Sequence, residues 1–136
     1  WVSRLLAEGG GRVFLEESGI HAGGVYPTTL LVATSELLRS RPGNVQTLVA
    51  VNAATVEWVS RNPRPARDLV NLALQRHTGK KLPAELIDSA WQRLSFGTDP
   101  LEESLRESAR AARRLDYLPS SDITGIVVAP AEWKAS

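Results

Sequence analysis

The sequence contains no cysteine and no methionine. Without cysteine, the chain cannot form a disulfide, an iron–sulfur cluster, a thiolate zinc site or a cysteine nucleophile. A chain without cysteine suits an oxidising compartment but does not require one. A complete translation product begins with methionine unless it is processed, so a chain that begins with Trp1 is expected to be a piece of a longer protein.

The sequence also lacks an excess of either charge and has no long hydrophobic run. Its 16 basic and 15 acidic residues leave a net charge of +1. This balance gives no electrostatic reason to expect binding to nucleic acid or to an anionic membrane. No apolar run approaches the roughly 20 residues of a membrane-spanning helix. With 136 residues, 43% of them hydrophobic, the chain is long enough for one globular domain with a core.

The segment from Tyr26 to Thr34 is predicted to be the central strand of an α/β unit. Its middle, residues 29–33, is apolar without alternation, a pattern typical of a strand that is covered on both faces. Pro27 and the β-branched residues favour a strand over a buried helix. A shorter strand is predicted at 12–16, and the brief apolar stretch at 123–128 is predicted to be an edge strand or a docking segment.

Most of the remaining chain shows the apolar spacing of amphipathic helices. Helices are predicted at 1–8, 35–41, 45–61, 65–77, 84–95 and 100–116. Asn44 and Asp99 are the predicted N-caps of the helices at 45–61 and 100–116. Two apolar stripes on the 45–61 helix predict a central position, and Trp58 and Trp91 are predicted to lie in the core. These patterns predict a mainly α chain of about five helices with two or three short strands.

No arrangement of residues in the sequence predicts catalysis. His21 and His77 lack a second ligand at metal-binding spacing, so no metal site is expected. Glu16 and Glu17 are neighbours on a predicted strand and would point to opposite faces. The arginines between positions 106 and 114 alternate with acidic residues, which is typical of a solvated helix face. We therefore expect a binding or structural chain that is not an enzyme and uses no cofactor.

The order of several short motifs resembles a known family. They are Pro27-Thr28-Thr29 before a helix, Ala54-Thr55-Val56-Glu57-Trp58 (with Val56 as an extra residue) before Asn62-Pro63, Thr78-Gly79-Lys80, Phe96 before Asp99-Pro100-Leu101, and Leu118-Pro119. Over roughly residues 1–125, this order is similar to the C-terminal part of periplasmic substrate-binding proteins of ABC importers. The aliphatic sulfonate, taurine and nitrate group is the most similar.

The resemblance implies a two-lobed α/β fold, periplasmic-binding-protein-like and of type 2, that closes on a ligand. Residues 1–25 would end the second lobe and cross over, residues 26–128 would form the mostly helical end of the first lobe, and residues 129–136 would be a tail. Trp1, Tyr26 and Thr28 would lie near the cleft and bind substrate. The ligand would be a small anionic solute, the partners ABC permease subunits, and the location periplasmic or lipid-anchored outside the cytoplasm.

Two other interpretations remain open. The chain could be a self-standing helical protein-interaction module, or it could belong to a pyrimidine-synthesis enzyme of the same fold. Such enzymes use histidine, cysteine and iron, for which this sequence offers no matching set. Alone, the 26–34 strand has few sheet neighbours in the sequence, and unpaired strand edges recruit other chains. Self-association of this chain is therefore expected.

Overall fold

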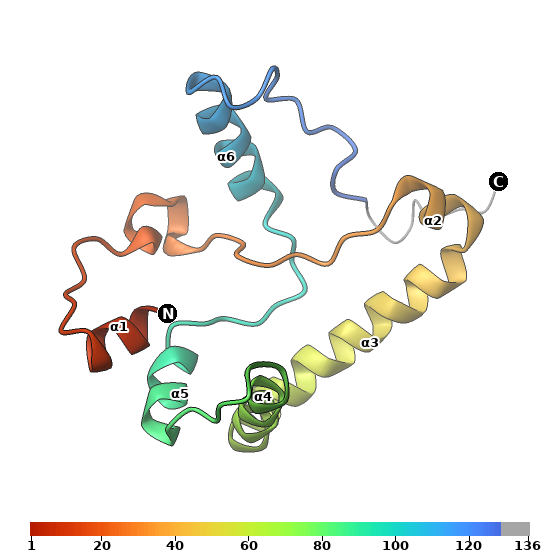
Figure 1. Cartoon of the computed structure of the whole chain (residues 1–136). Coiled ribbons are helices and arrows are strands. Elements are labelled where there is room, and N and C mark those ends of the chain that lie inside the picture. Colours follow the sequence, from red (N-terminus) through yellow and green to blue (C-terminus); the bar gives the residue numbers. More distant parts are fainter. Residues whose placement is uncertain (129–136) are drawn as a thin grey trace. The chain divides into compact units, whose positions relative to one another are not determined.

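The computed structural model describes residues 1–128 and is mainly helical (Figure 1). About 60% of this part is helix, well above the roughly one-third typical of globular proteins, and six α-helices form without a strand among the described residues. They are α1 (Val2–Glu8), α2 (Ser35–Ser40), α3 (Pro42–Arg61), α4 (Pro63–Thr78), α5 (Ala84–Trp91) and α6 (Glu102–Arg114), with short 3-10 turns at Glu17–Ile20 and Ala22–Gly24. The mainly α prediction is confirmed. The predicted tail, residues 129–136, lies outside the described residues.

Prolines set the beginnings of the two longest helices. Helix α3 begins at Pro42 and α4 at Pro63, two or three residues before the predicted starts. The first turn of a helix tolerates proline because the N–H groups there have no intrahelical partner. Asn44 therefore lies inside α3, and its prediction as an N-cap was wrong. Gly79 closes α4 as expected, with a φ of 76° that favours glycine.

The three predicted strands, at 12–16, 26–34 and 123–128, were wrong for the described residues. The backbone of residues 27–33 makes no hydrogen bond to any described residue, and the chain bends at Thr28 and Thr29. Leu30, Leu31 and Val32 are 40%, 51% and 80% exposed instead of buried. A strand exists only when a neighbouring strand takes up its N–H and C=O groups, and neither shorter segment does so.

The chain divides into two compact units. Unit 1 comprises Trp1–Phe14 and Asn52–Thr98, and unit 2 comprises Leu15–Val51 with the described part of the chain from Asp99 onward. Helix α3 runs through the boundary between Val51 and Asn52.

In unit 1, a buried asparagine fixes the loop between α4 and α5. Asn71 on α4 is 6% exposed. Its Nδ2 donates to the carbonyl oxygen of Leu82 at 2.8 Å, and its Oδ1 accepts from the N–H of Leu82 at 2.9 Å. The amide thus pairs both backbone groups of Leu82, as a buried polar side chain must to offset its loss of water. Arg67 on α4 adds an ion pair with Asp88 on α5 at 3.1 Å.

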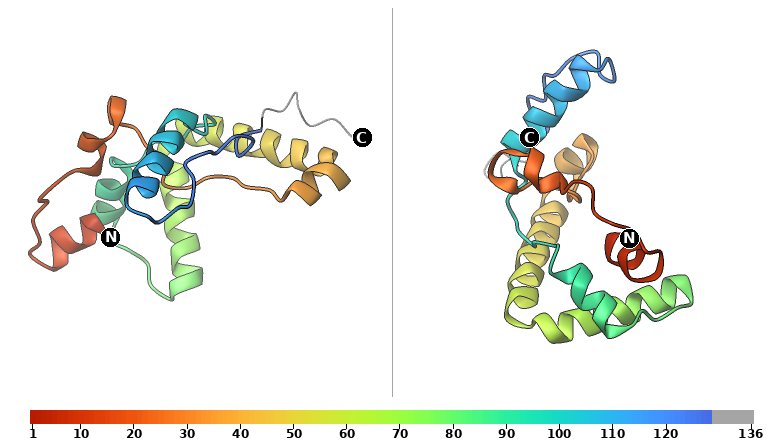
Figure 2. Two further views of the ribbon diagram at one scale, coloured as in Figure 1. Left: turned by 90° about the horizontal axis from the view of Figure 1, so that it is seen from above. Right: turned by 90° about the vertical axis from the view of Figure 1, so that its left-hand side faces the viewer.

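Helix α1 contacts α5 within the same unit (Figures 1 and 2). Ser3 of α1 is 6% exposed, and its hydroxyl accepts a hydrogen bond from the hydroxyl of Ser89 at 3.1 Å. The small serine side chains let the two helices approach. Leu86 and Ile87 of α5 are buried, as their helical spacing predicted.

The core of the described residues is thin. Among the described side chains of unit 2, two apolar ones are buried, Val45 on α3 and Ala109 on α6. Both had been placed on inward-facing stripes by their spacing. Trp58 is 41% exposed, so its assignment to the core was wrong. Trp91 is half-buried, with its ring tilted against Phe96 at a centroid distance of 4.9 Å. Helical spacing identified the inner face but not whether a neighbour would cover it.

Replacing the buried asparagine should destabilise the chain. Asn71→Ala leaves the part-buried N–H and C=O of Leu82 without their partner, so the free energy of unfolding should fall by about 2 kcal/mol. Urea unfolding followed by circular dichroism measures it. Asn44→Ala is the control, since Asn44 is exposed and its side chain makes no hydrogen bond in the described structure; it should change stability by less than about 0.5 kcal/mol. Equal effects of the two substitutions would contradict this role of Asn71.

The pKa of one carboxyl group should depend on a nearby threonine. The hydroxyl and then the N–H of Thr124 lower the pKa of Asp122 below 3.8, the N–H lying 2.9 Å from Oδ1. A depressed carboxyl pKa stabilises the folded chain above the unfolded pKa, and this contribution is lost as pH falls through the folded pKa. Thr124→Val should raise the pKa of Asp122 toward 3.8, which an NMR titration of its side-chain carboxyl measures. Thr98→Val serves as the control, and an unchanged pKa in Thr124→Val would rule out the hydroxyl contribution.

Candidate functional site

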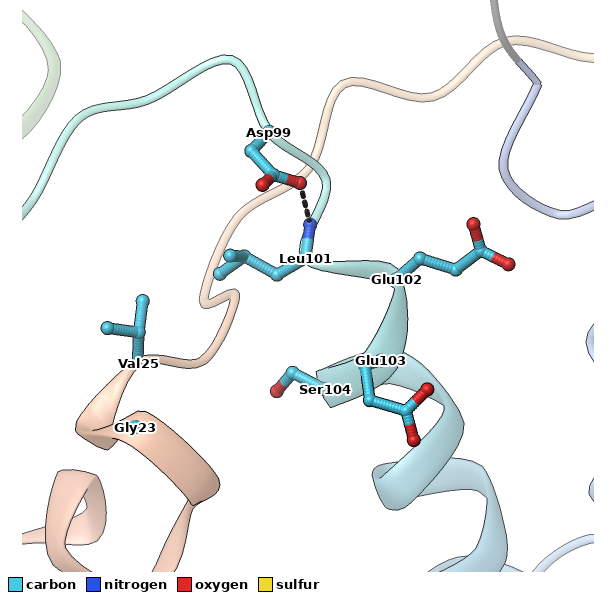
Figure 3. A pocket seen from close by; sticks show the side chains of 7 residues that line it. All are labelled: Gly23, Val25, Asp99, Leu101, Glu102, Glu103 and Ser104. Atoms are coloured by element: carbon cyan, nitrogen blue, oxygen red, sulfur yellow. Dashed lines mark hydrogen bonds between the residues drawn. The ribbon is translucent and has the colours of Figure 1, made fainter.

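A small open pocket lies at the beginning of α6 in unit 2 (Figure 3). Its volume is about 290 Å³, near the lower limit for small-molecule sites. It is lined by Gly23, Val25, Asp99, Leu101, Glu102, Glu103 and Ser104. Figure 3 shows Leu101 and Ser104 pointing toward Val25, whereas the carboxylate of Glu102 points to the opposite side. The hollow is therefore apolar on one side and acidic at its edge.

The turn before α6 shapes this pocket. Asp99 Oδ1 accepts a hydrogen bond from the N–H of Leu101 at 2.8 Å. Leu101 has a φ of 55°, in the left-handed region that a leucine seldom occupies, and α6 starts only at Glu102. Asp99 was predicted to be the N-cap of a helix at 100–116. That prediction was wrong by two residues, because the aspartate turns the chain before the helix instead of capping it.

The chemistry of the pocket disfavours an anion. Asp99, Glu102 and Glu103 supply only negative charge at its edge, and like charges repel. Two of these carboxylates are engaged along the helix, Glu102 with Arg106 and Glu103 with Arg110 at 3.1 Å. Within the described residues, no group of three or more histidine, cysteine or acidic side chains is placed to hold a metal ion.

Ser104 is a pocket residue that sequence patterns did not single out. Its Oγ is buried and has no hydrogen-bond partner in the described structure. A serine in the first turn of a helix is common, so nothing in the sequence indicated that this hydroxyl would be buried without a hydrogen-bond partner. We call it the orphaned hydroxyl. Only the fold around Val25 and Leu101 reveals it.

The structure places the predicted substrate-binding residues in both units. Tyr26 and Thr28 lie in unit 2, directly after Val25 of the pocket, whereas Trp1 lies in unit 1. Trp1 is 89% exposed, and the guanidinium of Arg4 lies 5.9 Å from its ring centroid. Thr28 is exposed, so its hydroxyl is free to meet a ligand. Tyr26 and Thr28 are thus together on one segment.

Tyr26 is held by an aromatic contact that the sequence did not predict. The imidazole of His21 stacks on its ring at a centroid distance of 4.5 Å and an interplanar angle of 17°. His21 Nε2 also lies 3.7 Å from Oε1 of Glu17. The 17–26 loop therefore orients Tyr26, and the only signal for this in the sequence was the presence of His21 in a glycine-rich loop.

Comparison with protein families, with curated proteins and with solved structures found no match to this chain. No helix among the described residues is long and apolar enough to cross a membrane. The site must therefore be judged by its own chemistry.

Removing the orphaned hydroxyl should stabilise the chain. A buried hydroxyl without a partner keeps its desolvation cost, so Ser104→Ala should raise the free energy of unfolding by about 1 kcal/mol. Ser108→Ala, at an exposed position of the same helix, controls for the higher helix propensity of alanine. Urea unfolding compares the two. A smaller gain in Ser104→Ala than in Ser108→Ala would mean that the hydroxyl has a partner in solution.

Proposed function

We propose that this chain is the C-terminal part of the solute-binding component of an ABC importer. The longer protein captures a small anionic solute, such as an aliphatic sulfonate, taurine or nitrate, and delivers it to a membrane permease without chemical turnover. The order of motifs between Pro27 and Pro119 supports this proposal. The location that follows is periplasmic, or lipid-anchored outside the cytoplasm.

The observation that carries the proposal is the exposed apolar segment around Leu31. Leu30, Leu31 and Val32 are all at least 40% exposed, and in a strand Leu30 and Val32 would lie on one face and Leu31 on the other. A segment that is apolar on both sides and has an unpaired backbone fits the centre of a covered sheet. In the proposed α/β protein, strands outside this chain supply that sheet.

The proposed division into lobes follows from the same resemblance. Residues 1–25 end the second lobe and cross over, and residues 26–128 complete the first lobe. Trp1, Tyr26 and Thr28 contribute to the cleft. The hydroxyls of Tyr26 and Thr28 and the indole N–H of Trp1 are hydrogen-bond donors, which an oxyanion requires. The acidic pocket beside α6 plays no part in binding this solute, because its carboxylates repel it.

A second candidate function is a helical protein-interaction module. Leu69, Val70 and Leu72 on α4 are 56%, 43% and 41% exposed, which is unusual for a helix with a partly buried face. A module of this kind would bind another protein through helix faces and would not bind sulfonates or nitrate. Solute binding distinguishes the two candidates.

Calorimetry on the longer protein tests the proposed function. Alkanesulfonates, taurine and nitrate are titrated, and at least one should bind. The double variant Tyr26→Ala/Thr28→Val should weaken binding at least about a hundredfold, since it removes two hydrogen bonds to a charged group and each contributes about 1.5–3 kcal/mol. Tyr117→Ala is the matched control, because Tyr117 is 79% exposed and lies outside the proposed cleft. Absence of binding by all three solutes would falsify the proposal.

A further inference from the structure

The exposed segment has a second property, which concerns the 136-residue chain by itself. We define the pairing segment as residues 29–33, which begins at the second residue of the bend at Thr28 and Thr29. None of its backbone groups bonds to a described residue. Between Glu17 and Glu36 the sequence holds no acidic, lysine or arginine residue. Two such segments can therefore approach without charge repulsion, and each offers N–H and C=O groups to the other.

We propose that two copies of this chain pair through residues 29–33 as antiparallel strands related by a two-fold axis. Leu31 then lies opposite its own counterpart in the second copy. In this register Leu30 faces Val32, and Thr29 faces Ala33. The segment is thus matched to itself, as a closed two-fold contact requires. Aliphatic and β-branched residues directly opposite one another stabilise antiparallel pairs.

The surroundings of the segment limit the pairing to this length. Pro27 cannot donate a backbone hydrogen bond, and the chain bends at Thr28. At the other end, Thr34 caps α2, its hydroxyl accepting from the N–H of Leu37 at 3.1 Å. Both ends of the ladder are therefore closed, so the pairing is limited to these five residues.

The remaining contact area must come from other exposed apolar side chains of unit 2. A stable interface buries about 800 Å² on each partner, more than five paired residues supply. Val25, Leu48 and Val51 of the same unit are 50%, 44% and 57% exposed and can contribute. The small ladder predicts a modest affinity, with a dissociation constant of about 1–100 μM. This inference does not depend on solute binding.

Disulfide trapping tests the register, because the chain has no cysteine of its own. Opposed Cα atoms lie about 4.5–5.5 Å apart in an antiparallel pair, within the 4.4–6.8 Å that a disulfide spans. Leu31→Cys should therefore form a covalent dimer when oxidised glutathione is added. The two thiols become one disulfide, and one glutathione disulfide becomes two glutathione molecules.

Thr29→Cys and Ala33→Cys supply the register control. In the proposed pair, each lies about 14 Å from its own counterpart, four residues at about 3.4 Å each, so neither variant should cross-link alone. An equal mixture of the two should cross-link. Leu69→Cys, at a comparably exposed site on α4, measures random collision. Efficient cross-linking of Thr29→Cys with itself would indicate a parallel pair and overturn the proposal.

Sedimentation equilibrium measures the affinity. The unmodified chain should dimerise, and Leu31→Lys should raise the dissociation constant at least tenfold because two like charges then face each other. Leu69→Lys should leave it unchanged. Circular dichroism confirms that both variants keep their helices. If the chain is still a monomer at about 100 μM, the proposal is overturned, and the segment remains available to a sheet in a longer protein. Open-ended aggregates would overturn it as well.

Discussion

The unpaired backbone of residues 27–33 is the constraint on which the rest of the structure depends. Backbone N–H and C=O groups must bond to protein or to water, and here, among the described residues, only water remains available to them. Staying in water keeps these groups satisfied but leaves Leu30, Leu31 and Val32 exposed. Covering the leucines requires a partner that also bonds the backbone. Only another strand can do both, so the segment cannot be buried by the helices of this chain.

Helices could be predicted well because their hydrogen bonds close within the element. Pro42, Pro63 and Gly79 act on their own neighbours, and the amphipathic spacing around Val45 and Leu86 needs no knowledge of the partner. The helices α3 and α4 begin earlier than predicted because Pro42 and Pro63 each occupy a first helical turn. The strands failed for the opposite reason. Their pattern states which faces are apolar, but pairing depends on residues far away in the sequence or in another chain.

In the candidate site, too, features that depend on distant residues could not be predicted from local sequence patterns. Tyr26 and Thr28 could be singled out only through a resemblance, because nothing local distinguishes them. The stack of His21 on Tyr26 and the orphaned Oγ of Ser104 depend on how the 17–26 loop and α6 are folded within unit 2. Trp58 shows the limit of local patterns most clearly. It lies on an apolar stripe of the sequence, but the stripe alone does not tell whether another element covers it, and Trp58 is 41% exposed.

The proposed solute-binding protein and the proposed dimer place Leu31 in different surroundings. In the proposed longer solute-binding protein, Leu31 would lie under a helix on one side of a sheet, and its backbone would be paired on both edges. In a dimer of this chain, only one edge of the backbone is paired. A central strand forms bonds on two edges and buries both of its faces, so the sheet is the stronger competitor whenever it is present. The proposed dimer would then form only when the strands of that sheet are absent. Dimerisation of this chain and solute binding by the longer protein are therefore compatible, because the segment pairs with a second copy only where the sheet is absent.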